Sequence, residues 1–273
     1  MDLRAELQVA EQAARAAGEL IRAHYERGTI EIETKADSSP VTVADKDANG
    51  AILAILQASF PADAILSEET PDDDARLTNH RVWIIDPLDG TKDFINRSGE
   101  FSVHVGLAID GAPAVGAVYQ PITRVMASAS RGHGAWRVVM GSGDGQRERM
   151  HVSATAELPA LRVGTSRAYP SAKLMAFLDE HRVASRVAMG ASTKLVAVAA
   201  GELDCVINMG SGELEWDTCA PEVIVREAGG AYSDRDGRPF RYNQADPMHH
   251  RGSIASNGVC HAAVVAALAR IAP

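Results

Sequence analysis

The sequence predicts a mixed fold in which an α+β first half precedes an α/β second half. In the first half, two helical patterns lead into short strand patterns joined by turn residues, which is typical of an antiparallel meander. In the second half, short apolar runs alternate with helical patterns, as in an α/β domain. Between the halves, residues 141–149 read GSGDGQRER and predict a flexible polar loop. We therefore expect two domains, 1–140 and 150–273.

The first half is expected to begin with an amphipathic helix over residues 2–26, because its apolar residues recur at helical spacing. A strand over 29–34 and a polar loop over 35–40 precede a second helix, which begins at Thr42 or Asp45 and reaches about Ser59. The strand patterns that follow are 64–67, 82–85, 102–110, 113–120, 124–129 and 134–138. Turn residues at Asp110-Gly111 and Gly132 join strands of the meander.

The second half is expected to contain both kinds of element in turn. Strands are predicted at 161–165, 183–188 and 204–208, and helices at 171–180, 191–200, 217–228 and 258–271.

Composition indicates a globular protein and excludes some kinds of partner. The 273 residues are 46% hydrophobic and 23% charged, which suits a globular chain with an ample core. The net charge of -9 argues against binding a nucleic acid polymer, because such proteins carry a basic surface. Three widely spaced cysteines, the lack of an N-terminal apolar signal region and the lack of any run of about 20 apolar residues predict a cytoplasmic protein without a membrane partner.

The most informative segment is Asp86-Pro87-Leu88-Asp89-Gly90-Thr91, which follows the apolar strand pattern of residues 82–85. Two carboxylates and a carbonyl at a strand end suit a hard divalent cation, because such ions prefer oxygen ligands. Gly90 and Thr91 open a short helix, whose free N–H groups suit a phosphate. Metal and phosphate together indicate phosphoryl transfer or phosphate hydrolysis. The alternative is an ordinary acidic turn that caps a helix.

Further carboxylates stand at comparable positions. Glu68 and Glu69 follow the strand pattern at 64–67, and Asp217 lies at the start of the helix at 217–228. The alternatives are a solvated glutamate pair and a helix N-cap. Two metal ions sharing carboxylates would suit hydrolysis of a phosphate ester. No Ser-His-Asp arrangement is visible from spacing, and His249-His250 is expected at the surface.

Three segments together resemble the signatures of the inositol monophosphatase superfamily. They are Glu68-Glu69, the segment from Asp86 to Thr91, and Trp216-Asp217 with the trailing Glu227-Ala228-Gly229-Gly230. The resemblance covers nearly the whole chain. It implies a layered αβαβα sandwich and a lithium-sensitive phosphatase that uses two or three Mg²⁺ ions. It also implies a small phosphorylated substrate and a monomer or homodimer.

The resemblance also implies residue roles. The implied metal ligands are Glu68, Asp86, the Leu88 carbonyl, Asp89 and Asp217. Glu68 and Thr91 would position the nucleophilic water, and Asp45 would hold Thr91. The N–H groups of Gly90 and Thr91 would bind the phosphate. The loop around Lys35 would be mobile and would help to bind a third metal.

Details of the sequence are similar to one branch, the 3′(2′),5′-bisphosphate nucleotidases of sulfur assimilation. Lys92 follows the DPLDGT segment, and Lys194 lies in Gly190-Ala191-Ser192-Thr193-Lys194. The resemblance implies that Ser192 and Lys194 bind a second phosphate; the alternative is a plain N-cap and a surface lysine. The expected reaction converts adenosine 3′,5′-bisphosphate to AMP and phosphate. The alternatives are an inositol-1-phosphatase or a broad sugar-phosphate phosphatase, and a non-catalytic phosphate-binding protein.

Overall fold

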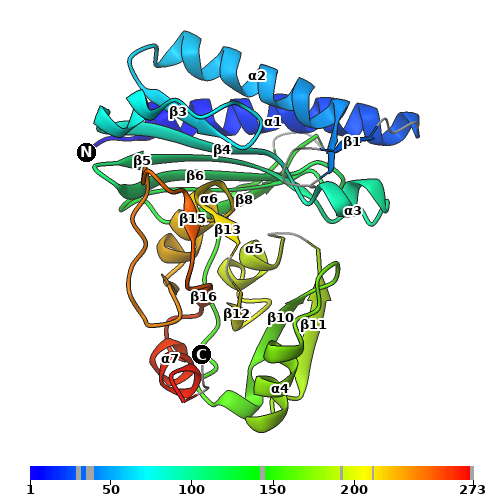
Figure 1. Cartoon of the computed structure of the whole chain (residues 1–273), viewed down its shortest axis with the longest axis vertical. Coiled ribbons are helices and arrows are strands. Elements are labelled where there is room, and N and C mark those ends of the chain that lie inside the picture. Colours follow the sequence, from blue (N-terminus) through cyan, green and yellow to red (C-terminus); the bar gives the residue numbers. More distant parts are fainter. Residues whose placement is uncertain (29–31, 35–39, 142–144, 191–192, 211, 271–273) are drawn as a thin grey trace.

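The structure, a computed structural model, describes residues 1–273 except 29–31, 35–39, 142–144, 191–192, 211 and 271–273. Two β-sheets are stacked with helices outside and between them (Figure 1). Helices α1 (Arg4–Arg27) and α2 (Val43–Ser59) lie together on the outer face of the larger sheet. Helices α5 (Thr193–Ala199) and α6 (Glu215–Glu227) lie between the sheets, and α4 (Ala172–Glu180) and α7 (His261–Leu268) lie beyond the smaller one. The expected layered αβαβα sandwich is therefore confirmed.

The larger sheet has seven strands in the order β3-β4-β5-β6-β7-β8-β9. Their bounds are Ala64–Ser67, Arg81–Asp89, Ser102–Ile109, Ala112–Gln120, Val125–Ser130, Ala135–Val139 and Glu148–Arg149. Strands β3 and β4 are parallel, and every later neighbour is antiparallel. The predicted meander is correct, and both residues of the Asp110-Gly111 turn have positive φ. The short helix α3 (Thr91–Ile95) follows β4 directly.

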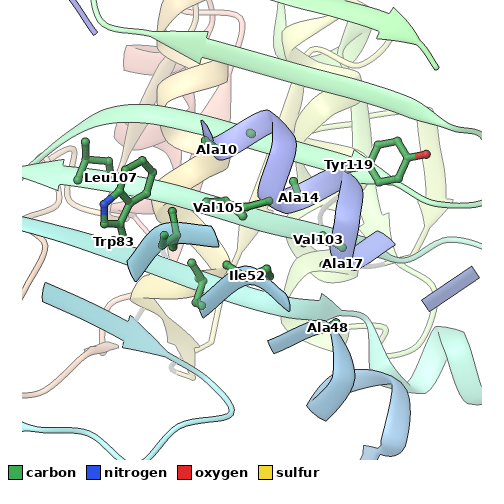
Figure 2. Close-up of a cluster of buried hydrophobic side chains, with 14 of the residues drawn as sticks. Ala10, Ala14, Ala17, Ala48, Ile52, Trp83, Val103, Val105, Leu107 and Tyr119 are labelled. Carbon is green, nitrogen blue, oxygen red and sulfur yellow. The ribbon is translucent and has the colours of Figure 1, made fainter. Parts of the chain in front are cut away.

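The outer face of this sheet forms the main core with α1 and α2. Alanines at helical spacing on α1, including Ala10, Ala14 and Ala17, are completely buried. Small side chains on this stripe let the helix lie close to the bulkier Trp83 and Val105 of the sheet, as Figure 2 shows.

The inner face of the sheet contacts α6 unusually closely. Gly106 of β5 and Gly116 of β6 are register partners, and α6 crosses the sheet above them. A Cβ atom on Gly116 would lie 2.3 Å from the carbonyl oxygen of Ala220. The glycine pair therefore lets the helix that carries Asp217 approach the sheet.

The smaller sheet has the order β11-β10-β12-β16-β14. Its strands are Ser185–Met189, Arg162–Ser166, Cys205–Asn208, Ser253–Ser256 and Ala231–Ser233. Strands β10, β11 and β12 are parallel, while β16 is antiparallel to both β12 and β14. Side chains along β12 point alternately to the two faces of the sheet. Cys205 and Ile207 pack in the core with α4 and α7, and Val206 packs in the core with α5 and α6.

Several short strands lie where the sequence predicted none. They are β9, β13 (Glu213–Leu214), β14, β15 (Met248–His249) and β16. Segments of two to four residues carry too few side chains to show a period, so only their pairing in the fold defines them. Near the N-terminus, β1 (Ile32–Thr34) pairs with β2 (Pro40–Thr42). The division into domains 1–140 and 150–273 stays a prediction. Among the described residues, no helix combines the length and apolar character needed to cross a membrane.

Candidate active site

A β-bulge at the end of β4 places two aspartates on one face of the sheet. Asp86 is the register partner of His104, and Asp89 is the register partner of Ser102, so β4 has one extra residue between these pairs. In a regular strand, side chains three positions apart would point to opposite faces. The bulge removes that alternation. Leu88 instead packs in the core of α1 and α2.

Asp217 completes an acidic cluster with these two aspartates. Each of the three can offer a carboxylate oxygen, and these oxygens lie within 4.8 Å of one another. Burial raises the pKa of Asp86 well above its ordinary value, and the charges of Glu68, Asp89 and Asp217 raise it further. Burial and the charge of Asp89 likewise raise the pKa of Asp217. Asp86 is buried, and Asp89 and Asp217 are half-buried. Three carboxylates that repel one another at such short range fit a hard divalent cation, which prefers oxygen ligands.

The start of α6 holds Asp217 in place. Its Oδ2 accepts a hydrogen bond from the Leu214 N–H at 2.7 Å, which caps the helix. The neighbouring Glu215 is buried and accepts the backbone N–H groups of Asn243 and Gln244 at 2.6 and 2.8 Å. Burial raises the pKa of Glu215 to about 7. These two hydrogen bonds hold the loop around residue 243 against the start of α6.

Thr91 and Asp45 meet beside the cluster. The Thr91 hydroxyl lies 3.2 Å from Asp45 Oδ1 and 3.3 Å from the Leu88 carbonyl oxygen. Asp45 is buried, and its Oδ2 accepts the Thr42 N–H at 2.8 Å and the Thr42 hydroxyl at 2.5 Å. Burial raises the pKa of Asp45, while its hydrogen bonds to Thr42 and Thr91 oppose that shift. The structure thus brings together two residues that are 46 positions apart in the sequence.

One cavity of about 370 Å³ joins the acidic cluster to both lysines singled out in the sequence. Glu68, Asp89 and Asp217 line one part of it, beside Gly90 and Thr91. The lysine, tyrosine and larger apolar side chains that also line it are Lys92, Lys194, Tyr169, Leu174, Val206, Ile207 and Met209. The wall also includes the polar residues Asp93, Ser166, Ser171, Asn208 and Glu213. Lys92 Nζ lies 4.1 Å from the centroid of the Tyr169 ring, which is a cation–π distance. Lys35, Ala191 and Ser192 lie outside the described residues.

Sequence reasoning missed two residues next to the cluster. His104 and Ser102 are completely buried on β5 and face the aspartates of β4. The ring nitrogen Nε2 of His104 lies 3.4 Å from Asp89 Oδ2 and 3.0 Å from the Ser102 hydroxyl. Burial lowers the pKa of His104. The signal available in the sequence was the pair of polar residues at positions 102 and 104 of an otherwise apolar strand.

The expected surface location of His249 is wrong. His249 is buried, its Nε2 lies 2.8 Å from the Thr218 hydroxyl, and its ring stacks on Phe240 at 4.0 Å between centroids. The pairing of β15 with β13, directly before α6, brings His249 to the helix, and sequence spacing does not reveal this pairing. His250 is exposed and contacts Asp246.

Comparison of the chain with known proteins confirms the family that the three sequence signatures predicted. A model described as the inositol monophosphatase family matches residues 2–272. The chain belongs to this family. It is 35% identical over 244 residues to the 3′(2′),5′-bisphosphate nucleotidase CysQ of Escherichia coli K12, covering 88% of this chain and 95% of that one. It is 37% identical over 215 residues to the 3′-phosphoadenosine 5′-phosphate phosphatase of Mycobacterium bovis, covering 74% and 72%.

Solved structures of family members share the fold. CysQ from Bacteroides thetaiotaomicron is 31% identical, with a TM-score of 0.78 over 93% of this chain and 97% of that one. The Thermotoga maritima IMPase is 28% identical, with a TM-score of 0.79 over 97% and 96%. This protein is therefore a phosphoric monoester hydrolase of the inositol monophosphatase family, with an acidic cluster able to hold a metal ion.

Proposed function

We propose that this protein is a Mg²⁺-dependent phosphatase that hydrolyses the 3′-phosphate of adenosine 3′,5′-bisphosphate, giving AMP and phosphate. The names of relatives at 35% and 37% identity support this substrate. The observation that carries the proposal is the shared cavity, because an acidic cluster for one phosphate and two lysines for another line the same space. We further propose that the enzyme acts in the cytoplasm as a monomer or homodimer.

The proposed metal ligands come from three segments of the chain. They are Glu68 after β3, Asp86, the Leu88 carbonyl and Asp89 at the end of β4, and Asp217 at the start of α6. Bound Mg²⁺, in two or three copies, would lower the pKa of a water molecule and offset negative charge on the phosphoryl group. The carboxylates of the cluster repel one another, and this repulsion makes a bound cation favourable.

Thr91 is proposed to orient the attacking water together with Glu68. Its hydroxyl hydrogen is directed to Asp45 Oδ1, and Asp45 is kept in position by two hydrogen bonds from Thr42. With its own hydrogen committed, the Thr91 oxygen is left to accept a hydrogen from water. The N–H groups of Gly90 and Thr91 are the proposed phosphate contacts. Attack at phosphorus breaks the bond to the 3′ oxygen and releases AMP.

The rest of the cavity suits the rest of this substrate. A 5′-phosphate near Lys92 or Lys194 would gain a charge-assisted contact. The apolar wall, which includes Tyr169, Leu174 and Met209, suits a planar base. Inositol phosphates have no apolar group to fill that wall.

The test is Mg²⁺-dependent phosphate release from three substrates in parallel, with and without lithium. They are adenosine 3′,5′-bisphosphate, inositol 1-phosphate and fructose 1,6-bisphosphate. We expect kcat/KM to be highest for the nucleotide, and we expect lithium to inhibit. Equal or better turnover of the other two would replace the proposal with an inositol- or sugar-phosphate phosphatase.

Replacing Asp89 distinguishes an enzyme from a non-catalytic phosphate-binding protein. In Asp89→Asn one negative charge of the cluster is lost while size is kept, so we expect phosphate release to fall to background. Circular dichroism of the variant checks that it folds. Hydrolysis that persists in the purified variant would show that the acidic cluster is not the reaction site.

A further inference from the structure

His104 bridges the two segments that carry the aspartates of the cluster. On one side of its ring, Nε2 lies 3.4 Å from Asp89 Oδ2 and 3.0 Å from the Ser102 hydroxyl, which is itself 3.4 Å from Asp89 Oδ2. On the other side, Nδ1 lies 3.3 Å from the backbone carbonyl oxygen of Trp216. Because a carbonyl oxygen only accepts hydrogen bonds, Nδ1 carries the hydrogen of the neutral ring and donates it to Trp216. Nε2 then accepts the hydrogen of the Ser102 hydroxyl, and this edge of the ring packs against the Asp89 carboxylate without donating to it.

The bridge joins parts of the chain that come from different halves. Asp89 ends β4 and Trp216 precedes Asp217 on α6, and the two segments are more than 120 residues apart in the sequence. His104, like Ser102, is completely buried on β5, which pairs with β4 and which α6 crosses at Gly106. The rigid ring of His104 therefore sets the separation between the Asp89 carboxylate and the start of α6.

We propose that His104, supported by Ser102, is a positioning residue that sets the geometry of Asp89 relative to Asp217 for metal binding. This inference rests on the metal site of the proposed function. The ring contacts the carboxylate of one proposed metal ligand and the backbone beside another, and His104 is not among the described residues that line the cavity. Groups that orient metal ligands in this way typically change metal affinity or activity by about 10- to 100-fold when they are removed.

The test measures metal binding directly, with the full chain and with Mn²⁺ as a probe for a carboxylate site. The electron paramagnetic resonance signal of free Mn²⁺ gives the dissociation constant without any substrate. We expect His104→Leu to weaken binding by about tenfold or more. Ser102→Ala removes one hydroxyl with little change in packing, and we expect a smaller weakening of several-fold.

His249→Leu is the matched control. His249 is also a buried histidine that contacts α6, at the Thr218 hydroxyl, but its other ring contacts among the described residues are with Phe240 and Tyr242 and not with the acidic cluster. We expect this variant to lose thermal stability and to keep the Mn²⁺ affinity of the wild type. The melting temperature of each variant is measured beside its Mn²⁺ affinity.

The outcomes separate this inference from the proposed function. If the wild type binds no Mn²⁺, the metal site itself is wrong. If the wild type binds Mn²⁺ and His104→Leu binds it within about twofold of that affinity while its melting temperature falls, His104 is only a packing residue. If His104→Leu does not fold, Ser102→Ala decides the matter, and wild-type affinity in that variant contradicts the proposal.

Discussion

At the scale of single residues, Asp45 and Asp217 each use one carboxylate oxygen to cap a helix. Both occupy the third position of a helix, and each accepts the N–H of the residue before that helix with Oδ2. In Asp45 the other oxygen is thereby left for Thr91. For Asp217 the sequence left open a capping role or a metal ligand. A carboxylate has two oxygens, so the observed capping bond leaves the proposed ligand role possible.

Lys194 provides a prediction at this scale. If it binds the second phosphate, Lys194→Ala loses one charge-assisted contact, so kcat/KM for adenosine 3′,5′-bisphosphate should fall about tenfold or more. Any activity on inositol 1-phosphate should stay within about twofold, because that substrate has no second phosphate. Lys173→Ala, at an exposed position of α4, is the control and should change neither value. Equal losses on both substrates would contradict the assignment.

At the scale of elements, the candidate site depends on a bulge in one strand and on a close contact between a helix and the sheet. The bulge in β4 turns Asp86 and Asp89 to the same face. The glycine pair of β5 and β6 lets α6 bring Asp217 to that face. Strand and helix patterns in the sequence predicted each element, but the bulge and the close approach follow from pairing and packing.

Replacing Gly116 tests the close contact between α6 and the sheet. In Gly116→Ala the added methyl would lie 2.3 Å from the Ala220 carbonyl oxygen, so α6 must move. We expect a loss of about 1–3 kcal/mol in the free energy of unfolding, and a fall in kcat because Asp217 moves with the helix. Gly50→Ala is the control: a Cβ there meets nothing within 4 Å, and helix α2 should gain up to about 1 kcal/mol. Wild-type stability and activity in Gly116→Ala would show that α6 is not held this closely.

At the scale of the whole molecule, the acidic cluster should make stability depend on pH and on bound metal. Asp86 and Asp217 have raised pKa values, mainly because of burial, so in metal-free protein they bind protons more tightly when folded. Their contribution is complete below the unfolded pKa, near 4, and is lost as pH rises through the folded pKa. We therefore expect the melting temperature in EDTA to fall as the pH is raised above about 4.

Added Mg²⁺ should reverse this loss. At a concentration about 100 times its dissociation constant, a ligand of the folded state adds about 2.7 kcal/mol, or roughly 5–10 °C. The gain should be larger at pH 8 than at pH 5.5, because the carboxylates must be deprotonated to bind metal. Differential scanning fluorimetry measures both effects. A gain that is independent of pH would show that Mg²⁺ does not bind at the cluster.

The sequence by itself determined the types of the longer elements, the family and most of the acidic residues of the proposed site. Helical spacing, strand patterns and the carboxylates after Ser67 and Ile85 are local features, so neighbouring residues are enough to reveal them. Only the tertiary structure decided which side chains meet. The contacts of Asp45 with Thr91 and of His104 with Asp89 and Trp216, and the burial of His249, join residues between 15 and 112 positions apart. Such contacts depend on strand register and on how α6 packs against the sheet, which no local pattern encodes.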